Sequence, residues 1–548
     1  MNAPNFNLNL GPIVLKWAEL GGPDGFLGKS VGGELSNPDN RGRRQRFENG
    51  YIYWSPATGA HEIHGNIYKK WESLGWESGL LGYPTSDEQD ESGGGRISHF
   101  EHGSIRWRKF DAPLSFVSYN MALLPLTPVG DPYKGSERDK AISALIENLR
   151  RKQPSVVGLS EVFVDSEKRH IHTKLEALYP HALTGPDEAD IESDGGLLLL
   201  SKYPMVLKHS TIFRQCAGDD KLANKGALHA RIEVPGHPTQ YDIFLSHTQN
   251  PDAGGKNAAR KQVKSQLRHL ASFVHAFSSP LRPALLMGDL NTDALDPDLY
   301  QDLKDRLDYS LDLWKITGDG TDGITLDKVN NFRLFDKITD PGTFNPPLPW
   351  NDSTRGRGGQ RIDYLLSWHG PQYWPLYRDT KVLRWQSSPG RDISDHYGLE
   401  TQQTHVRELH VTVRRPLGTT TLKLEQFHCL EETDEIGDDT VDFQLSYKPA
   451  QGIGISQWVG DVDDVATGDV YKYRSPVVFK IPDPGAWLDL TVKGREKDDL
   501  NADDNIDTAK IRIERRELTE LFRRTMRRVV RLSGDGGEYA VTMSIAVG

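Results

Sequence analysis

The segment Ser394-Asp395-His396-Tyr397-Gly398-Leu399 places a carboxylate beside an imidazole, shortly before the sequence changes its pattern. A carboxylate is an oxygen ligand for a hard cation, and an imidazole changes its protonation state near neutral pH. Side by side, these two groups indicate chemistry on a phosphate ester.

Five further polar segments precede this one, and each lies at or just after a short apolar run. They are Ser118-Tyr119-Asn120, Gly158-Leu159-Ser160-Glu161-Val162-Phe163, Phe244-Leu245-Ser246-His247, Met287-Gly288-Asp289-Leu290-Asn291 and Arg361-Ile362-Asp363-Tyr364. An isolated Asp or Asn after a β-like run is more often a turn former than a catalyst. Six such segments in this order predict that strand ends bring polar side chains to one rim.

Together, the six segments resemble those of the endonuclease/exonuclease/phosphatase superfamily of divalent-metal phosphoesterases, over about residues 113–405. The resemblance implies a central four-layer α/β sandwich. Three more segments are similar to the neutral sphingomyelinase-like branch: Gly195 to Pro204 with its GG(apolar)SKYP pattern, Asn224-Lys225-Gly226-Ala227, and Ser246-His247-Thr248-Gln249.

The resemblance also implies a role for each polar side chain. The metal ligands are Asn120, Glu161 and Asp395, for Mg²⁺ with Mn²⁺ as the alternative. The catalytic residues are His247, Asp289, Asn291, Asp363 and His396. Asp363 orients His396, Asp289 and Asn291 position water and phosphate, and His247 donates to a non-bridging oxygen. Either Asp289 or His396 is the general base.

Three functions fit this pattern. The first is a Mg²⁺-dependent phosphodiesterase of the sphingomyelinase or phospholipase C type, acting on a phospholipid. The second is a nuclease using the same residues, although a net charge of -11 disfavours a protein held on nucleic acid by counterion release. The third is an envelope- or glycan-binding protein whose central region is a non-catalytic scaffold.

The length of 548 residues predicts two to four domains. Cys216 and Cys429 lie in different predicted domains, so no disulfide framework is indicated. The sequence has neither an ordinary signal peptide pattern nor an apolar run of about 18 residues. We therefore expect a soluble chain without a transmembrane segment.

Residues 10–110 contain an internal repeat. Trp17, Leu20, Gly21, Gly25 and Gly28 recur 54 positions later as Trp71, Leu74, Gly75, Gly79 and Gly82. This pattern resembles the LGFP repeat of proteins associated with bacterial cell envelopes, which implies an extracellular or cell-surface location, with the cytoplasm as the alternative. The tryptophans either stack on an envelope glycan or form the core of the repeat, and the core is the favoured interpretation. The five are Trp17, Trp54, Trp71, Trp76 and Trp107.

Residues 113–405 have an alternating α/β pattern. Apolar residues at helical spacing predict helices over 137–151 and 258–277, and short apolar runs predict strands, among them 114–121, 154–159 and 283–287. Residues 315–360 are rich in Gly, Asp, Asn and Pro, which is typical of a long functional loop.

Residues 406–548 read as an antiparallel β-sandwich, with its first strand over 409–413 and its last over 539–547. Acidic clusters between the strands are reminiscent of a C2-like module that binds Ca²⁺, and solvated acidic loops are the equal alternative. A helical pattern over 517–531 carries Arg523, Arg524, Arg527, Arg528 and Arg531. These arginines either contact phosphates or anionic lipid, or form a solvated face paired with carboxylates.

Overall fold

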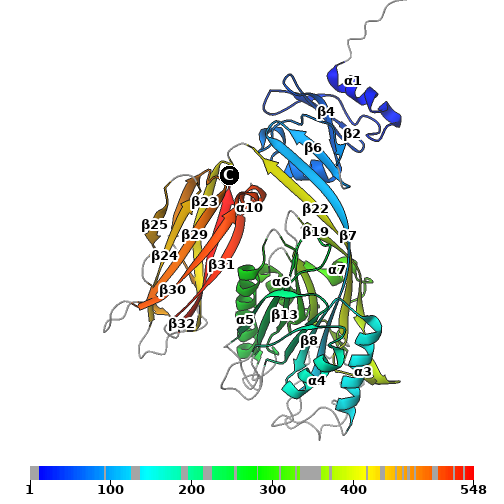
Figure 1. Cartoon of the computed structure of the whole chain (residues 1–548), viewed down its shortest axis with the longest axis vertical. Coiled ribbons are helices and arrows are strands. Elements are labelled where there is room, and N and C mark those ends of the chain that lie inside the picture. Colours follow the sequence, from blue (N-terminus) through cyan, green and yellow to red (C-terminus); the bar gives the residue numbers. More distant parts are fainter. Residues whose placement is uncertain are drawn as a thin grey trace, which may run out of the picture.

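The computed structural model describes most of the chain (Figure 1). The described residues are 11–91, 94–124, 136–186, 195–213, 225–251, 256–279, 282–307, 310–327, 330–331, 333, 359–368, 373–414, 417–431, 439–450, 453–459, 462–465, 470–473, 477–496, 504–521, 525–534 and 537–548. Cys216, Asn224, Arg523, Arg524 and most of the acidic clusters lie outside them.

The predicted repeat is visible as two similar units at the top of Figure 1. The first contains α1 (Pro12–Glu19), η1 (Gly22–Asp24) and a sheet of β1 (Leu35–Ser36), β2 (Arg43–Phe47), β3 (Gly50–Ser55) and β4 (Gly59–His64). The second contains α2 (Gly65–Ser73), η2 (Trp76–Ser78), β5 (Gln89–Asp90), β6 (Arg96–Phe100) and the start of β7 (Gly103–Leu123). Equivalent indoles make equivalent bonds: Trp17 Nε1 donates to the Gly28 carbonyl at 3.0 Å, and Trp71 Nε1 to that of Gly82 at 3.1 Å.

Most of the repeat tryptophans belong to the core, as favoured from the sequence. Trp71 is fully buried, while Trp17, Trp54 and Trp107 are partly buried against core clusters. Trp76, by contrast, is 39% exposed.

Residues 409–413 form a strand as predicted, but the prediction that this strand belongs to the C-terminal sandwich is wrong. Residues 409–413 are the end of β22 (Gly398–Val413), which pairs with β7 along nearly its whole length, from Leu399↔Ser118 to Val413↔Gly103. The end of β22 thus supplies the second repeat with the neighbour that β4 gives to β3 in the first. Two long strands therefore tie the repeats to the central region (Figure 1).

The central region contains two mixed sheets. In the first, the order β19-β22-β7-β8-β10-β9 includes β8 (Val156–Val162), β9 (His181–Gly185), β10 (Leu197–Ser201) and β19 (Tyr373–Leu383). In the second, the order β11-β12-β13-β14-β18-β15 joins β11 (Met205–Ile212), β12 (Gly226–Ile232), β13 (Tyr241–His247), β14 (Ala284–Asp289), β18 (Asp363–Trp368) and β15 (Leu311–Asp312). Short pairs are formed by β16 (Leu326–Asp327) with β17 (Gly359–Gln360), and by β20 (Gln386–Ser388) with β21 (Arg391–Asp392).

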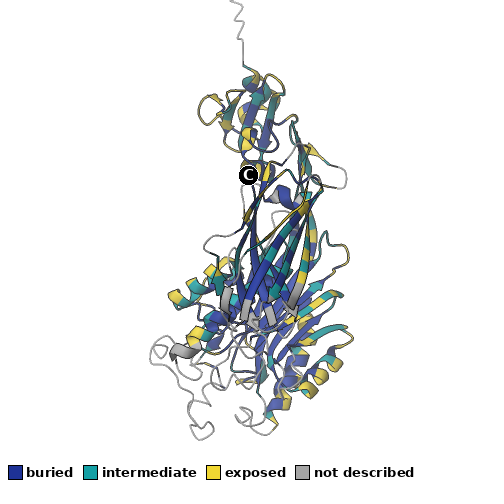
Figure 2. Cartoon of the chain, turned by 90° about the vertical axis from the view of Figure 1, so that its left-hand side faces the viewer, coloured by how far each residue is buried: buried dark blue, intermediate teal, exposed yellow. Residues whose placement is uncertain are grey.

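Helices flank these sheets, with their outer turns exposed and the strands buried (Figure 2). One core cluster joins the first sheet to α3 (Glu137–Lys152) and α4 (Asp165–Leu175), and another joins the second sheet to α5 (Lys256–Phe277) and α6 (Pro297–Arg306). A third cluster contains residues of both sheets and of α7 (Leu313–Thr317). The two long predicted helices are thus confirmed to within two residues.

The C-terminal region contains two antiparallel sheets that share one buried cluster with the second repeat. One sheet joins β23 (Thr419–Glu431), β27 (Val470–Lys472), β28 (Val478–Pro482), β31 (Thr525–Gly534) and β32 (Gly537–Val547). The other joins β24 (Asp439–Pro449), β25 (Ile455–Trp458), β26 (Val462–Val465), β29 (Trp487–Glu496) and β30 (Asp504–Glu514). Among the helices that the structure describes, none has the length and apolar content that a membrane crossing requires.

The helix predicted over 517–531 is also wrong. Helix α10 (Arg515–Glu520) is short, and the chain then enters β31, where pairing with β32 overrides the helical pattern. Arg528 donates to the carbonyl of Ser278 at 3.2 Å, and Arg531 donates to Thr211 Oγ1 at 2.9 Å. These two arginines therefore connect the C-terminal sheet to the central region.

Candidate functional site

Strand ends bring the predicted polar residues together. Asn120 lies near the end of β7 opposite Ser160 of β8, beside Glu161, and the parallel pairing of β13 with β14 sets His247 opposite Asp289. Antiparallel pairing then sets Asp289 opposite Asp363 of β18. Parallel strands deliver their carboxyl ends to one edge of a sheet, which is where ligands of α/β proteins commonly bind.

Glu161, His247 and Asp289 form one group of potential metal ligands. Asn120 Nδ2 donates to Glu161 Oε1 and to Asp289 Oδ2, both at 3.0 Å. His247 Nε2 lies 3.4 Å from Glu161 Oε1 and 3.8 Å from Asp289 Oδ2. Two carboxylates from different sheets thus converge on one point, with an amide between them.

The electrostatics of this group fit a divalent cation. Burial raises the pKa of Glu161, and nearby Asp395 raises it further, against the opposing effect of Lys225. Burial together with Asp363 raises the pKa of Asp289 to about 7. Clustered carboxylates without enough positive charge disfavour their ionised form, and a hard cation with oxygen ligands removes that penalty. Glu161 and Asp289 are therefore suitable oxygen donors, while the Asn120 amide turns its Nδ2 toward them and its Oδ1 toward the Ala122 N–H at 3.0 Å.

His396 and Asp363 form the second part of the site. His396 Nδ1 lies 2.9 Å from Asp363 Oδ2, and its Nε2 lies 3.8 Å from Asp289 Oδ2. Burial alone would lower the pKa of His396, but Asp363, Asp289 and Asp395 raise it to about 10. The Asp363 carboxylate thereby fixes the orientation of the imidazole and leaves Nε2 directed at the other carboxylates.

Several site residues have an unusual backbone conformation. Glu161 has a φ of 55° and Asn291 a φ of 44°, in the left-handed region that few non-glycine residues adopt. Asn291 is held there because its N–H donates to Asp289 Oδ1 at 2.8 Å and its Nδ2 donates to the Thr248 carbonyl at 2.9 Å. Such strain is typical of functional sites. The neighbouring Gly288 is required, since a Cβ there would lie 2.0 Å from the Ser246 carbonyl oxygen.

Lys225 belongs to the site, although no role was predicted for it from the sequence. Its buried Nζ lies 2.9 Å from His247 Nε2. Burial and this ammonium hold the pKa of His247 well below 6.5, so the imidazole is neutral. The signal was available in the Asn-Lys-Gly segment, whose lysine directly precedes β12, where Gly226 pairs with His247 of β13. Lys225 thus places a positive charge beside the carboxylates.

Comparison with known proteins agrees with this geometry. The model of the Endonuclease/Exonuclease/phosphatase family matches residues 117–396, which include every one of these side chains. The chain belongs to this family. It is accordingly a metal-dependent phosphoric ester hydrolase. The LGFP repeat model matches residues 27–79 and 81–112.

Individual relatives align with only part of this chain. Sphingomyelinase C of Listeria ivanovii is 29% identical over 280 residues, which are 45% of this chain and 74% of the relative. Phospholipase C of Staphylococcus aureus is 26% identical over 214 residues, 36% of this chain and 62% of its own length. The solved beta toxin of Staphylococcus aureus aligns with 53% of this chain and 99% of itself, at 21% identity and a TM-score of 0.41.

Proposed function

We propose that this chain is a Mg²⁺-dependent phosphodiesterase of the sphingomyelinase or phospholipase C type. The observation that carries the proposal is the convergence of Glu161 and Asp289 on the Asn120 amide, beside the His396–Asp363 pair. The phospholipid class of substrate is supported by the names of the two curated relatives and by the net charge of -11, which disfavours nucleic acid.

In the proposed reaction, Glu161 and Asn120 hold the metal, with Asp395 as a further ligand. A bound divalent cation supplies Lewis acidity toward the phosphoryl and leaving oxygens. Asp289 and Asn291 position a water molecule, whose oxygen attacks phosphorus as the bond to the leaving oxygen breaks. The proton of that water passes to Asp289 or His396, and Asp363 fixes His396 throughout. His247 and Lys225 stabilise the charge that develops on a non-bridging oxygen.

The test is a parallel hydrolysis assay of the wild type and His396→Ala on sphingomyelin, phosphatidylcholine, plasmid DNA and bis(p-nitrophenyl) phosphate, each with Mg²⁺ or with chelator. We expect chelator-sensitive, His396-dependent hydrolysis of a phospholipid. Cleavage of DNA alone would replace the lipid substrate by nucleic acid. No hydrolysis of any of the four would contradict the proposal and favour an envelope- or glycan-binding scaffold.

We further propose three functional units: repeats over 10–110 that bind a cell-envelope glycan, a four-layer phosphoesterase unit over 113–405, and a C2-like sandwich that binds Ca²⁺, predicted over 406–548 but beginning only after β22 ends at Val413. The repeats support an extracellular or cell-surface location. The Ca²⁺ proposal is tested by thermal unfolding with Ca²⁺ in excess over Mg²⁺, where a rise in the Tm of the C-terminal transition is expected. Pull-down on isolated cell-wall glycan tests the repeats.

A further inference from the structure

Helix α5 contacts both the C-terminal sheet and the strand that leads to the candidate site (Figure 1). At its end, Ala276 packs against the buried pair Val529 of β31 and Ala540 of β32. Earlier in the helix, Leu270 belongs to the same core cluster as Phe244 of β13. The helix is therefore a packed element between the C-terminal sheet and β13.

Arg531 of β31 fixes this helix by polar contacts. Its guanidinium donates to Thr211 Oγ1 at 2.9 Å and lies 3.0 Å from His269 Nε2. Thr211 Oγ1 lies 2.8 Å from the same ring nitrogen, and Arg531 Cζ lies 5.3 Å from the centre of the Phe273 ring. Hydrogen bonds from a charged donor are stronger than those between neutral groups. Arg531 thus joins the C-terminal sheet to α5 and to β11 at one point.

One turn before His269, Gln266 holds the segment that follows β13. Its Oε1 accepts the N–H of Gln249 at 2.7 Å, and the side chain is only 2% exposed. Gln249 stands two residues after His247, where β13 ends. Residues three apart in a helix are neighbours on its surface. A shift of α5 at His269 is therefore also a shift at Gln266.

The segment held by Gln266 in turn holds Asn291. Thr248 N donates to the Asp289 carbonyl at 3.1 Å, and Thr248 Oγ1 donates to the Leu290 carbonyl at 2.6 Å. The Thr248 carbonyl accepts the bond from Asn291 Nδ2 at 2.9 Å. Because Asn291 has a strained φ of 44°, it depends on such contacts to keep its place.

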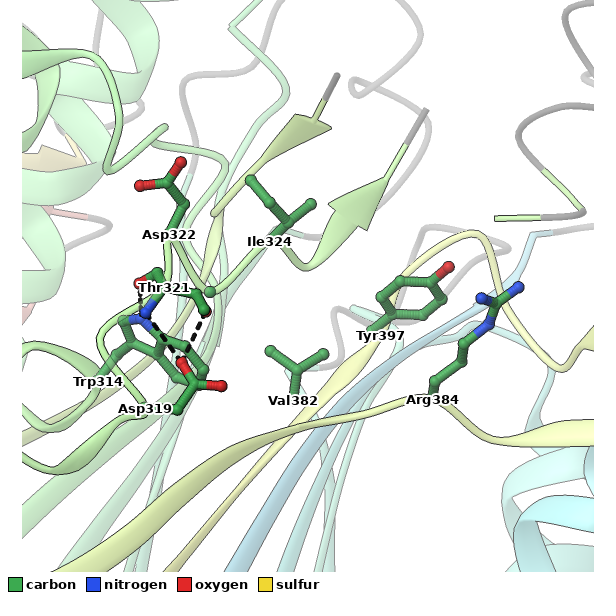
Figure 3. A pocket seen from close by; sticks show the side chains of 9 residues that line it. Trp314, Asp319, Thr321, Asp322, Ile324, Val382, Arg384 and Tyr397 are labelled. Atoms are coloured by element: carbon green, nitrogen blue, oxygen red, sulfur yellow. Dashed lines mark hydrogen bonds between the residues drawn. The ribbon is translucent and has the colours of Figure 1, made fainter. Parts of the chain in front are cut away.

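The His396 side of the site is supported differently. Tyr397, which follows His396 in the chain, donates its N–H to the Thr325 carbonyl at 2.7 Å. The Arg384 guanidinium lies 5.4 Å from the centre of the Tyr397 ring (Figure 3). These contacts are made within the central region. A change at the C-terminal sheet should thus affect Asn291 before it affects His396.

We propose that the C-terminal sheet positions the candidate active site through α5, with Arg531 and Gln266 as positioning residues. Arg531 fixes the helix at His269, and Gln266 carries that position to the end of β13 and from there to Asn291. Packed side chains and rigid helices are the means by which distant sites are coupled. The proposal rests on the phosphodiesterase function proposed above, and it gives the C-terminal region a part in that reaction.

The kinetic test uses the full chain and bis(p-nitrophenyl) phosphate with Mg²⁺. Arg531→Met keeps an extended apolar side chain and removes the donors, so we expect kcat to fall about threefold to tenfold with KM within about twofold. Arg531→Lys retains a charged donor and should recover most of kcat. The control Arg527→Met removes an exposed arginine of the same strand, paired with Glu425 at 3.0 Å, and should behave as the wild type. An unchanged kcat in Arg531→Met would overturn the proposal.

A double-variant cycle tests whether the two positioning residues act on one path. Gln266→Met removes the acceptor of the Gln249 N–H, and we expect it to lower kcat about tenfold. If Arg531 acts through Gln266, the variant Arg531→Met/Gln266→Met should lose no more than Gln266→Met alone. Losses that multiply would show two independent contributions and contradict the proposal.

Hydrogen exchange separates this proposal from the proposed function, because it needs no substrate. Below the unfolding transition, the Gln249 amide should exchange about tenfold faster in Arg531→Met than in the wild type or in Arg527→Met, measured on peptides that cover residues 244–250. Faster exchange in a protein that hydrolyses no phosphodiester would support the positioning of this segment by the C-terminal sheet and contradict the enzymatic proposal. Hydrolysis with an unchanged exchange rate in Arg531→Met would do the reverse.

Discussion

The two ends of strand β13 show buried carboxylates in opposite situations. At its start, Asp242 is completely buried and accepts bonds from three donors: His229 Nε2 at 3.0 Å, Arg231 Nε at 2.7 Å and Arg282 Nε at 2.9 Å. Burial opposes ionisation of Asp242, but these donors outweigh it and lower its pKa. At the other end, next to His247, Asp289 is equally buried and its pKa is raised to about 7.

This difference distinguishes a carboxylate that stabilises the fold, Asp242, from one that belongs to the candidate site, Asp289, within one sheet. The Asp242 carboxylate is satisfied by the protein, so its ionised form stabilises the fold. The Asp289 carboxylate accepts bonds from neutral groups but faces other carboxylates, so a bound cation would supply the compensating charge. Residue type and burial are the same at both ends, but the charge of the neighbours differs: the donors to Asp242 include two arginines, whereas Asp289 accepts bonds from neutral groups of Asn120 and Asn291 and lies near other carboxylates.

Substitution of the two buried histidines should give the largest difference in activity between the two ends of β13. His396 pairs with Asp363 at the active end, and His229 pairs with Asp242 at the other. We expect His396→Ala to lower kcat/KM by about 10³ to 10⁴, the range for a group that transfers or stabilises a proton. His229→Ala should lower the free energy of unfolding instead and leave kcat/KM within about threefold. Similar activity losses in both variants would remove the distinction between the two ends.

Asp242→Asn should have the next largest effect. It leaves Arg231 and Arg282 beside a neutral amide in a buried place, which costs about 3 kcal/mol. Because the folded pKa of Asp242 is lowered, its contribution is present above the unfolded pKa of about 4 and is lost on acidification. Urea unfolding at neutral pH measures the loss, and Mg²⁺-dependent activity should be retained per folded molecule. A stability equal to that of the wild type would contradict this account of Asp242.

Metal binding should supply the charge that the active end lacks. At a Mg²⁺ concentration about 100 times its Kd, the wild type should gain about 2.7 kcal/mol of stability. Glu161→Gln should lose most of that gain, because it removes one of the converging carboxylates. Urea unfolding with and without Mg²⁺ checks this, with Glu176→Gln as an exposed control at the end of α4. An equal gain in Glu161→Gln would place the cation elsewhere.

Asp289→Asn is expected to act in the opposite direction to Asp242→Asn. In chelator it relieves a disfavoured charge and should stabilise the protein by about 1 kcal/mol at pH 7, while abolishing hydrolysis. The raised pKa gives the sign with pH: the wild type should gain stability as pH falls from 7 toward 5, where Asp289 takes up a proton, and Asp289→Asn should not. Destabilisation of the variant would show that the carboxylate is satisfied after all.

The sequence predicted the polar residues near the Asp289 end of β13, but it did not predict the buried Asp242 cluster at the other end. Asn120, Glu161, Asp289 and Asp363 stand at or beside the ends of apolar runs, and strand pairing necessarily gathers such positions. Asp242 lies inside a run, where no local pattern distinguishes it, because its donors come from other elements.

Long-range pairing explains both wrong predictions. Residues 409–413 read as a new sandwich strand because their partner, residues 103–107 of β7, lies about 300 positions earlier. Residues 517–531 have a helical pattern, yet β31 gains a full ladder with β32 and a contact with the central region. A short stretch of sequence does not show either of these pairings with a distant strand.

Substitution of Asp87 should give the smallest change in stability. Its carboxylate has hydrogen-bond partners, as that of Asp242 does, but it is less buried. It joins the repeats: Lys16 Nζ donates to its Oδ2 at 3.1 Å, Glu62 N donates to its Oδ1 at 3.0 Å, and His61 Nδ1 lies 3.4 Å away. Burial opposes these partners but does not outweigh them, and the pKa of Asp87 is lowered to about 2.

Since its carboxylate is satisfied like that of Asp242 but remains 27% exposed, solvent screens the interaction. Asp87→Asn should therefore cost only about 0.5–1 kcal/mol at pH 7. Its lowered pKa makes the difference from the wild type shrink as pH falls from 5 to 3, because Asp87 contributes only while it is ionised in the folded state. Urea unfolding at both pH values measures this. A loss as large as that of Asp242→Asn would mean that the number of donors, and not the exposure of the carboxylate, determines its contribution.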